Sequence, residues 1–224
     1  MSGPEATPDE VVLTPMRASD VGELARIHER AFTGFFLASL GTPFLREFYR
    51  GYLTDPSSVA IVAREAATGR PIGCAVGTVE PEGFYGRLLR RRGLAFALAG
   101  ARAAITHPRV VAPRLLAAVR YRGDTPSGSG GALFASMCVD PNTGSRGVGG
   151  RLSQAWSDGA AARGATRAYL TTDADDNDAV NRHHQRNGWT IDAEYHTPAG
   201  RHMYRYVKHL TPAGPGTHGT EPPR

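Results

Sequence analysis

Hydrophobic residues recur along this chain with two different periods, and the sharpest change of period lies near residue 140. An uninterrupted apolar run over residues 132–139 predicts a buried strand. Beyond it, Leu152, Ala155 and Trp156 recur at helical spacing within residues 151–163 and predict a helix. The pattern therefore predicts a strand that enters a glycine-rich turn, which in turn opens a helix.

The same reasoning assigns the rest of the chain to alternating strands and helices. The predicted strands are 11–17, 59–63, 72–79, 165–172, 189–195 and 201–209, and the predicted helices follow Asp20, run from Thr42 to about Tyr52, and cover 83–104, 113–121 and 177–187. Asp20 followed by Glu23 predicts a capping box, and Thr42 followed by Pro43 predicts an N-cap with proline at the first helical position.

Composition limits the class of protein. The chain has 224 residues, 41% hydrophobic and 21% charged, as in an ordinary soluble globule. We expect one domain over residues 11–210, with disordered tails at 1–10 and 211–224. No apolar run approaches the ~18 residues that a membrane span needs. Cys74 and Cys138 lie in apolar runs, so we expect reduced core thiols and a cytoplasmic protein.

Residues 80–124 form a basic segment. Nine arginines stand there against Glu80, Glu82 and Asp124, which gives a net charge of +6, whereas the whole chain carries +5. One interpretation is a pair of solvated helices or a homodimer contact, and another is a lid that attracts an anionic acceptor. A membrane-surface role is a weaker alternative, and the scarcity of stacking aromatic residues disfavours nucleic acid.

The turn after the 132–139 strand has the chemistry of an anion site. Gly144, Gly147, Gly149 and Gly150 let the backbone approach a ligand closely, and Arg146 adds a positive charge. The free N–H groups at the start of the next helix, with its dipole, favour a pyrophosphate. The alternative is a tight turn that only lets the helix leave the sheet. The turn lacks the Gly-Lys-Ser/Thr of a P-loop and the third glycine of a Rossmann fingerprint.

The turn resembles the acetyl-CoA-binding motif of the GNAT N-acetyltransferase superfamily. Val139-x-Pro141 precedes it, as in that family, and the family's core reads Gln/Arg-x-x-Gly-x-Gly/Ala. In this register the core begins at Gly144 and its glycines fall at Gly147 and Gly149. The expected Gln/Arg is therefore absent, and Arg146 is the nearest substitute for its charge.

A second motif supports the resemblance. Residues 177–189 are similar to the family's helix Asn-x-x-Ala-x-x-x-Tyr-x-x-x-Gly-Phe, with Asn177, Gly188 and Trp189 in matching positions. His184 stands where the family has tyrosine. The two motifs occur in the family's order, and the resemblance extends over about residues 11–210.

The resemblance implies an α/β fold with a mixed, mostly antiparallel sheet of about seven strands. Strands four and five are then parallel and splayed, and the basic segment is a helical insertion between strands three and four. It implies acetyl-CoA as cosubstrate. The acidic loop 173–178 lacks EF-hand spacing, so we expect no metal there.

The resemblance also implies the residues of the site. The expected acetyl-CoA contacts are Cys138, Val139, Gly144, Ser145, Arg146, Gly147, Val148, Gly149, Gly150 and Asn177. The N–H of Cys138 or Val139 would face the thioester carbonyl. His184 would protonate the departing thiolate or only hydrogen-bond it. The motifs do not identify the base, and Glu80 or Glu82, at the end of a central strand, could act as base through water.

The expected reaction is direct attack of a primary amine on acetyl-CoA. We favour a small acceptor, such as an amino sugar or its nucleotide-linked form, because an insertion over the site would narrow it. The alternatives are acetylation of a protein or peptide amine, a non-catalytic acyl-CoA-binding module, and a membrane-associated enzyme that uses longer acyl chains.

Overall fold

The protein is built around one mixed β-sheet. The computed structural model describes residues 10–33, 36–106, 130–143, 147–198 and 200–211. The strands are β1 (Val11–Pro15), β2 (Ser58–Glu65), β3 (Pro71–Thr78), β4 (Ala132–Val139), β5 (Arg167–Asp173), β6 (Thr190–His196) and β7 (His202–His209). They stand in the order β1-β2-β3-β4-β5-β7-β6, and only β4 and β5 are parallel neighbours. The mixed, mostly antiparallel sheet expected from the sequence is confirmed.

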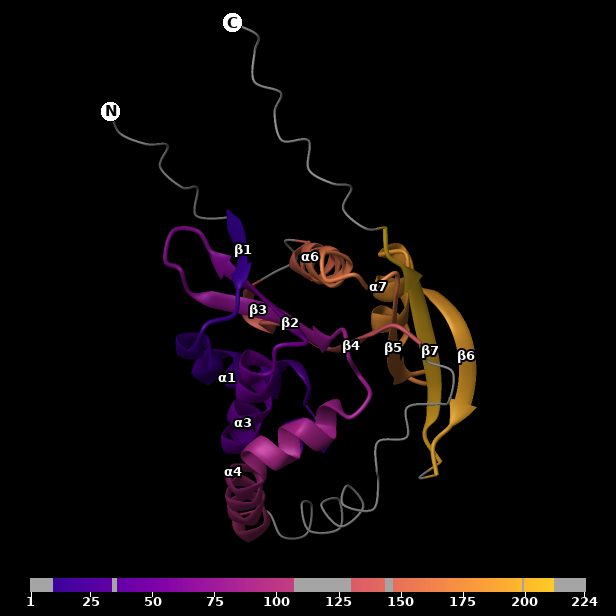
Figure 1. Cartoon of the computed structure of the whole chain (residues 1–224). Helices are drawn as coiled ribbons and strands as arrows, with labels where there is room; N and C mark the ends of the chain where they lie inside the picture. Colours follow the sequence, from indigo (N-terminus) through magenta and orange to yellow (C-terminus); the bar gives the residue numbers. More distant parts are fainter. Residues whose placement is uncertain (1–9, 34–35, 107–129, 144–146, 199, 212–224) are drawn as a thin grey trace, which may run out of the picture.

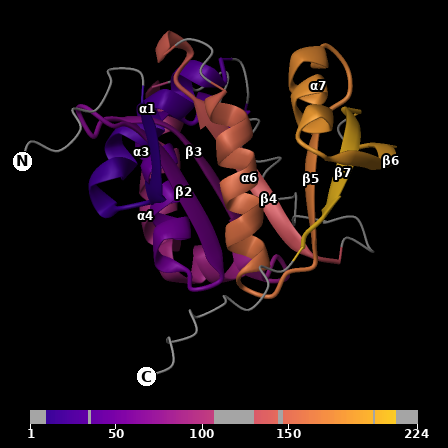
Figure 2. The ribbon, with the colours of Figure 1, turned by 90° about the horizontal axis from the view of Figure 1, so that it is seen from above.

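Helices cover both faces of this sheet (Figure 1). They are α1 (Val21–Ala31), α2 (Phe36–Ser39), α3 (Gly41–Thr54), α4 (Phe84–Thr106), α6 (Val148–Ala161) and α7 (Asp178–Arg186), with 3-10 turns η1 (Ala18–Asp20) and η2 (Pro141–Thr143). One face packs against α1, α3 and α4, and the other packs against α6. Helix α7 lies beside α6, next to β5 and β7 (Figure 2). The helix predicted at 113–121 lies outside the described residues.

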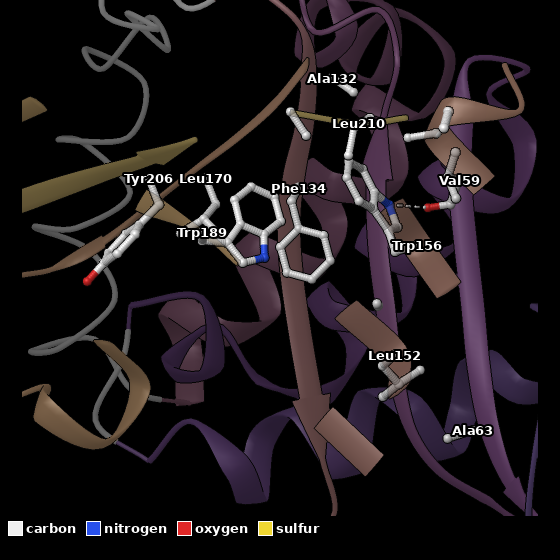
Figure 3. Packing of buried hydrophobic residues seen from close by; sticks show 14 of the residues in the cluster. Val59, Ala63, Ala132, Phe134, Leu152, Trp156, Leu170, Trp189, Tyr206 and Leu210 are labelled. Atoms are coloured by element: carbon white, nitrogen blue, oxygen red, sulfur yellow. Dashed lines mark hydrogen bonds between the residues drawn. The ribbon is translucent and has the colours of Figure 1, made fainter. Parts of the chain in front are cut away.

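An aromatic cluster joins the two halves of the sheet (Figure 3). The Phe134 ring on β4 lies 4.8 Å from the Trp156 ring on α6 and 5.5 Å from the Trp189 ring that precedes β6. Both indole N–H groups are satisfied, since Trp156 donates to the Val59 carbonyl and Trp189 to the Ser153 hydroxyl, each at 3.1 Å. Buried aromatic pairs of this kind contribute beyond their buried area. The cluster therefore holds β4 and the β5–β7 half together on the α6 side.

The predicted capping box at Asp20 and Glu23 is wrong by one turn. Asp20 makes no side-chain cap to α1. Its Oδ2 instead accepts a bond from the Arg17 N–H at 2.7 Å and from the Arg64 guanidinium at 2.6 Å. Asp20 is only 3% exposed, so its charge needs the arginine. The three-residue spacing is real, but it joins Arg17 to Asp20.

The N-cap predicted at Thr42 is also displaced. Helix α3 begins at Gly41, so Thr42 lies inside its first turn. The Thr42 hydroxyl donates to the Glu29 carboxylate at 2.5 Å. Thr42 therefore ties α3 to α1 and does not cap α3.

The first part of the basic insertion is a helix, α4, held against α3 by ion pairs. Arg92 Nε donates to Glu47 at 2.8 Å, and Arg87 Nε donates to Asp55 at 3.1 Å. Arg91 also reaches Asp55, at 3.5 Å. Three of the insertion's arginines thus neutralise two acidic groups of the protein itself, and less of their charge remains for an anionic acceptor. The side chain of Arg102, together with Arg109, Arg114, Arg120 and Arg122, lies outside the described residues.

Two histidines are buried in the core. His28 on α1 is 3% exposed, and its Nδ1 lies 2.8 Å from the Tyr49 hydroxyl. His184 on α7 is 6% exposed, between the rings of Tyr206 and Trp189. Burial lowers the pKa of each imidazole to about 4, because a buried charge loses its hydration. Both side chains are therefore neutral at neutral pH.

These histidines make the stability depend on pH. Their pKa is lower in the folded state than the ordinary 6.5, so the unfolded chain binds more protons and stability falls as pH drops below 6.5. We expect each histidine to remove about 2 kcal/mol from the free energy of unfolding by pH 5. Urea denaturation should show His184→Phe losing about 2 kcal/mol less than wild type between pH 7 and pH 5.

His209→Gln is the control, since His209 is exposed at the end of β7. It should lose as much stability as wild type over this range. An equal loss in wild type and His184→Phe would contradict the assignment of a neutral, buried His184.

Candidate active site

The sheet opens between β4 and β5. These strands pair at only two positions, Ala132 with Ala168 and Leu133 with Tyr169. Beyond Leu133 the two strands diverge, as Figure 2 shows. Val76 pairs with Ser136 and Gly77 with Phe134, so Ala135 is an extra residue in β4, a bulge where the strands separate. The splay expected between strands four and five is thus present.

Main-chain groups of β4 face this opening. The Asp140 N–H donates to the Ile72 carbonyl on the β3 side at 2.8 Å. Because hydrogen-bonding direction alternates along an antiparallel strand, Cys138 also turns its N–H toward β3, and Met137 and Val139 turn theirs toward β5. Of the two residues expected to meet the thioester carbonyl, the alternation favours Val139. The side chain of Cys138 points to the face of the sheet that packs against α1 and α3, where its sulfur lies 3.5 Å from the Tyr49 hydroxyl.

The start of α6 lies at the open end of the gap. Gly147 has φ +65° and is the N-cap of α6, with no side-chain cap bond. This left-handed conformation favours glycine, and the N–H groups of the first turn receive no cap from it. The Val148 side chain is buried in the core, so Val148 could serve a ligand only through its main chain. Gly144, Ser145 and Arg146, the other residues expected here, lie outside the described residues.

Gly149 and Gly150 have a packing role that the sequence did not reveal. A β-carbon on Gly149 would lie 2.9 Å from the His183 ring, and one on Gly150 would lie 3.0 Å from the Asn187 side chain. His183 belongs to α7 and Asn187 follows it. These two glycines therefore let α6 and α7, the two motif helices, approach closely.

Asn177 is tied to the end of β5. Its side-chain amide nitrogen donates to the Thr172 hydroxyl at 2.8 Å and to the Asp173 carbonyl at 3.0 Å. Of the Asn177 side chain, only the carbonyl oxygen is therefore free to bind a ligand. The neighbouring acidic loop is held by basic side chains, since Asp173 pairs with Arg201 at 2.8 Å.

His184, like Asn177, lies on the β5 side of the gap. Its Nδ1 is buried without a hydrogen-bond partner in the described part of the chain. An unpartnered buried nitrogen is costly unless a ligand or water reaches it. Since its pKa is about 4, an imidazolium is not available at neutral pH. The chemistry open to His184 is a hydrogen bond from the neutral ring.

Glu80 and Glu82 lie at the other end of β4. They follow Thr78, the last residue of β3, which pairs with Leu133 where β4 and β5 are still together. Val139 lies six residue steps along the strand from Leu133, about 20 Å at ~3.3 Å per residue. The Glu80 side chain is 70% exposed. The structure therefore does not bring these carboxylates to the open end of the gap.

A buried polar chain on the face opposite α6 was also missed by sequence reasoning. His28, Tyr49 and Cys138 are linked by contacts of 2.8 and 3.5 Å, and the Cys74 and Cys138 sulfurs lie 3.7 Å apart as free thiols. Burial raises the pKa of the Tyr49 hydroxyl well above its ordinary value. These side-chain contacts join α1 and α3 to β4, the strand that borders the gap. No local pattern links residues so distant in sequence.

Among the helices in the described ranges, none combines the length and apolar character needed to cross a membrane. Within the same ranges, no three His, Cys, Asp or Glu side chains gather as a metal site.

Comparison with known proteins agrees with this architecture. The ribosomal-protein-S18-alanine N-acetyltransferase of Escherichia coli is similar in fold, with a TM-score of 0.55 at 13% identity over 94% of this chain and 100% of that one. The polyamine N-acetyltransferase of Drosophila melanogaster gives 0.55 at 14% identity, over 90% and 100% of the chains. Ard1 of Thermoplasma volcanium gives 0.53 at 14% identity, over 90% and 98%. At these identities the likeness is one of fold.

No curated protein matches the sequence significantly. The model of the acetyltransferase (GNAT) family, however, matches residues 23–189, which include the splayed strands and both motif helices. The chain therefore belongs to the acetyltransferase (GNAT) family of acetyl-CoA-dependent N-acetyltransferases.

Proposed function

We propose that this enzyme moves the acetyl group of acetyl-CoA to the primary amine of a small acceptor, by direct attack of the amine on the thioester. The observation that carries the proposal is the position of the β4 edge and the start of α6 at one opening of the sheet. The Val139 N–H faces the gap, and the N–H groups from Gly147 to Gly150 lie where the gap opens. One extended ligand could contact both.

The polarity of these groups indicates which part of the coenzyme each would contact. Main-chain N–H groups at the start of α6 suit the pyrophosphate, because the helix dipole adds to their partial charges. Gly144, Ser145 and Arg146 would extend this contact. The pantetheine arm would lie along β4, where the main chains of Met137 and Val139 would be its partners. The side-chain carbonyl oxygen of Asn177 would contact it from the β5 side of the gap. The Val139 N–H would then stabilise the oxyanion that forms when the amine attacks.

His184 would act as a neutral hydrogen-bond donor to the departing thiolate. Its pKa of about 4 argues against proton transfer from an imidazolium, so water or the acceptor's own ammonium group would supply the proton. Glu80 and Glu82 lie at the paired end of the gap, about 20 Å of strand from Val139, whereas a general base acts within hydrogen-bond reach or through one water. The proposal therefore assigns them no part in an attack at Val139 and leaves the base unassigned.

The proposed acceptor is a small amine such as an amino sugar. The ion pairs of Arg87, Arg91 and Arg92 with Asp55 and Glu47 weaken the case for a nucleotide-linked form, because part of their charge is already neutralised. The structural neighbours are named for a ribosomal-protein alanine and for polyamines. A peptide amine is therefore the alternative acceptor, and a non-catalytic acyl-CoA-binding module is the alternative without chemistry.

Release of free CoA from acetyl-CoA, followed with a thiol reagent, tests the acceptor. We expect release with amino sugars and none with N-acetylated forms of the same sugars, which lack the amine and serve as matched controls. Turnover with peptides alone would overturn the small acceptor. Tight CoA binding without turnover of any amine would favour the binding module.

His184→Phe tests the thiolate contact. A hydrogen bond to a charged group contributes about 1.5–3 kcal/mol, so we expect kcat to fall about 10- to 150-fold with little change in the KM for acetyl-CoA. The fall should be the same at pH 6 and pH 8, because the imidazole does not titrate in that range. An unchanged kcat would remove His184 from the mechanism.

A further inference from the structure

Asp140 connects the strand beside the gap to the turn that leads into α6. It follows β4 directly and precedes η2. Its N–H donates to the Ile72 carbonyl at 2.8 Å, and its carbonyl accepts the Thr143 N–H at 3.1 Å and the Thr143 hydroxyl at 2.8 Å. The main chain of Asp140 thus belongs both to the sheet and to the turn.

The Asp140 carboxylate is buried, at 2% exposure, and is bonded on both oxygens. Oδ1 accepts the Asn142 N–H at 3.1 Å, and Oδ2 accepts Arg30 Nη2 at 2.8 Å, with Arg70 Nη1 at 3.9 Å. Burial alone would raise the pKa of this carboxyl, but the bonds from Asn142 and Arg30 outweigh burial and lower it. The group is therefore a fixed negative charge at neutral pH.

Arg30 connects helix α1 to the Asp140 carboxylate. It lies in the last turn of α1, on the face of the sheet opposite α6, and it also pairs with Glu23 at 3.3 Å. Helix α1 contacts both β4 and η2. The ion pair of Arg30 and Asp140 therefore joins the helix layer on one face to the turn that delivers α6 to the other.

We infer that Asp140, held by Arg30, is a positioning residue for the cosubstrate. Its side-chain bonds to Asn142 and Arg30 set the direction in which the chain leaves β4, and hence where the N–H groups at the start of α6 lie relative to the gap. The inference rests on the proposed function, because it assumes that those N–H groups bind the pyrophosphate of CoA. It adds that the Asp140 side chain, which lies outside the glycine turn, determines the affinity for CoA.

Asp55 offers a matched control. It is also a buried aspartate, 8% exposed, whose Oδ1 accepts the Ser57 N–H at 3.0 Å and whose Oδ2 accepts Arg87 Nε at 3.1 Å. It lies just before β2, near Thr78, to which the Ser57 hydroxyl is hydrogen-bonded at 2.7 Å. That is the end of the sheet away from the gap's opening. Asp55→Asn should therefore copy the loss of a buried ion pair without touching the turn.

The experiment measures the Kd for CoA by titration calorimetry, with the KM for acetyl-CoA, kcat and Tm, for wild type, Asp140→Asn and Asp55→Asn. Both variants should lose Tm. We expect Asp140→Asn to raise Kd and KM about tenfold or more, as small displacements of positioning groups do, with kcat within about threefold. Asp55→Asn should change Kd and KM less than about twofold.

Arg30→Gln keeps the test decisive if Asp140→Asn does not fold, since Arg30 is 37% exposed and easier to replace. It should raise Kd in the same direction, and the double variant should bind no worse than Asp140→Asn alone, because both changes break one interaction. A Kd that rises no more in Asp140→Asn and Arg30→Gln than in Asp55→Asn would overturn the inference. Wild-type protein that binds no CoA would instead overturn the proposed function.

Discussion

The open edge of β4 is the constraint on which the site depends. β5 pairs with only Ala132 and Leu133, so the rest of β4 has a neighbour on one side alone. An open sheet edge with free amide groups invites pairing with another chain or ligand. Here Phe134, between Trp156 and Trp189, joins the two halves of the sheet by side-chain packing where main-chain bonds end. The gap can therefore exist without loss of the fold.

Several charged side chains in the described part of the protein are committed to ion pairs within its own structure. Arg87, Arg91 and Arg92 of the insertion bind Glu47 and Asp55 of the α3 segment, and Arg30 binds Asp140. A basic segment in a sequence suggests an anionic partner, but these pairs give part of it a structural use. The groups that we propose for the coenzyme are uncharged main-chain N–H groups. Their effect depends on direction, which the surrounding ion pairs can fix.

Local patterns in the sequence predicted the elements well, because strand and helix periods and the glycine turn are local properties. The strand at 132–139 is found with the predicted bounds, and the splay expected from the resemblance is present. The spacing of Asp20 and Glu23 misled because Arg17 and Asp20 satisfy the same three-residue rule, and only the buried contact with Arg64 decides between them.

What the sequence could not supply are contacts between distant segments. The packing of Gly149 against His183 joins residues 34 positions apart, and the pairing of Arg30 with Asp140 joins residues 110 apart. The neutral state of His184 follows from burial under Tyr206 and Trp189, which no local pattern reveals. The roles of the individual site residues stay predictions.

The most direct measurement is hydrogen exchange of single backbone amides by NMR, with and without saturating acetyl-CoA. The account predicts that exchange at Val139 and at Gly147–Gly150 slows when acetyl-CoA is added. The Cys138 amide, which faces β3, should exchange slowly in both states. Unchanged exchange at Val139 and at the start of α6, under conditions where acetyl-CoA saturates the protein, would contradict it.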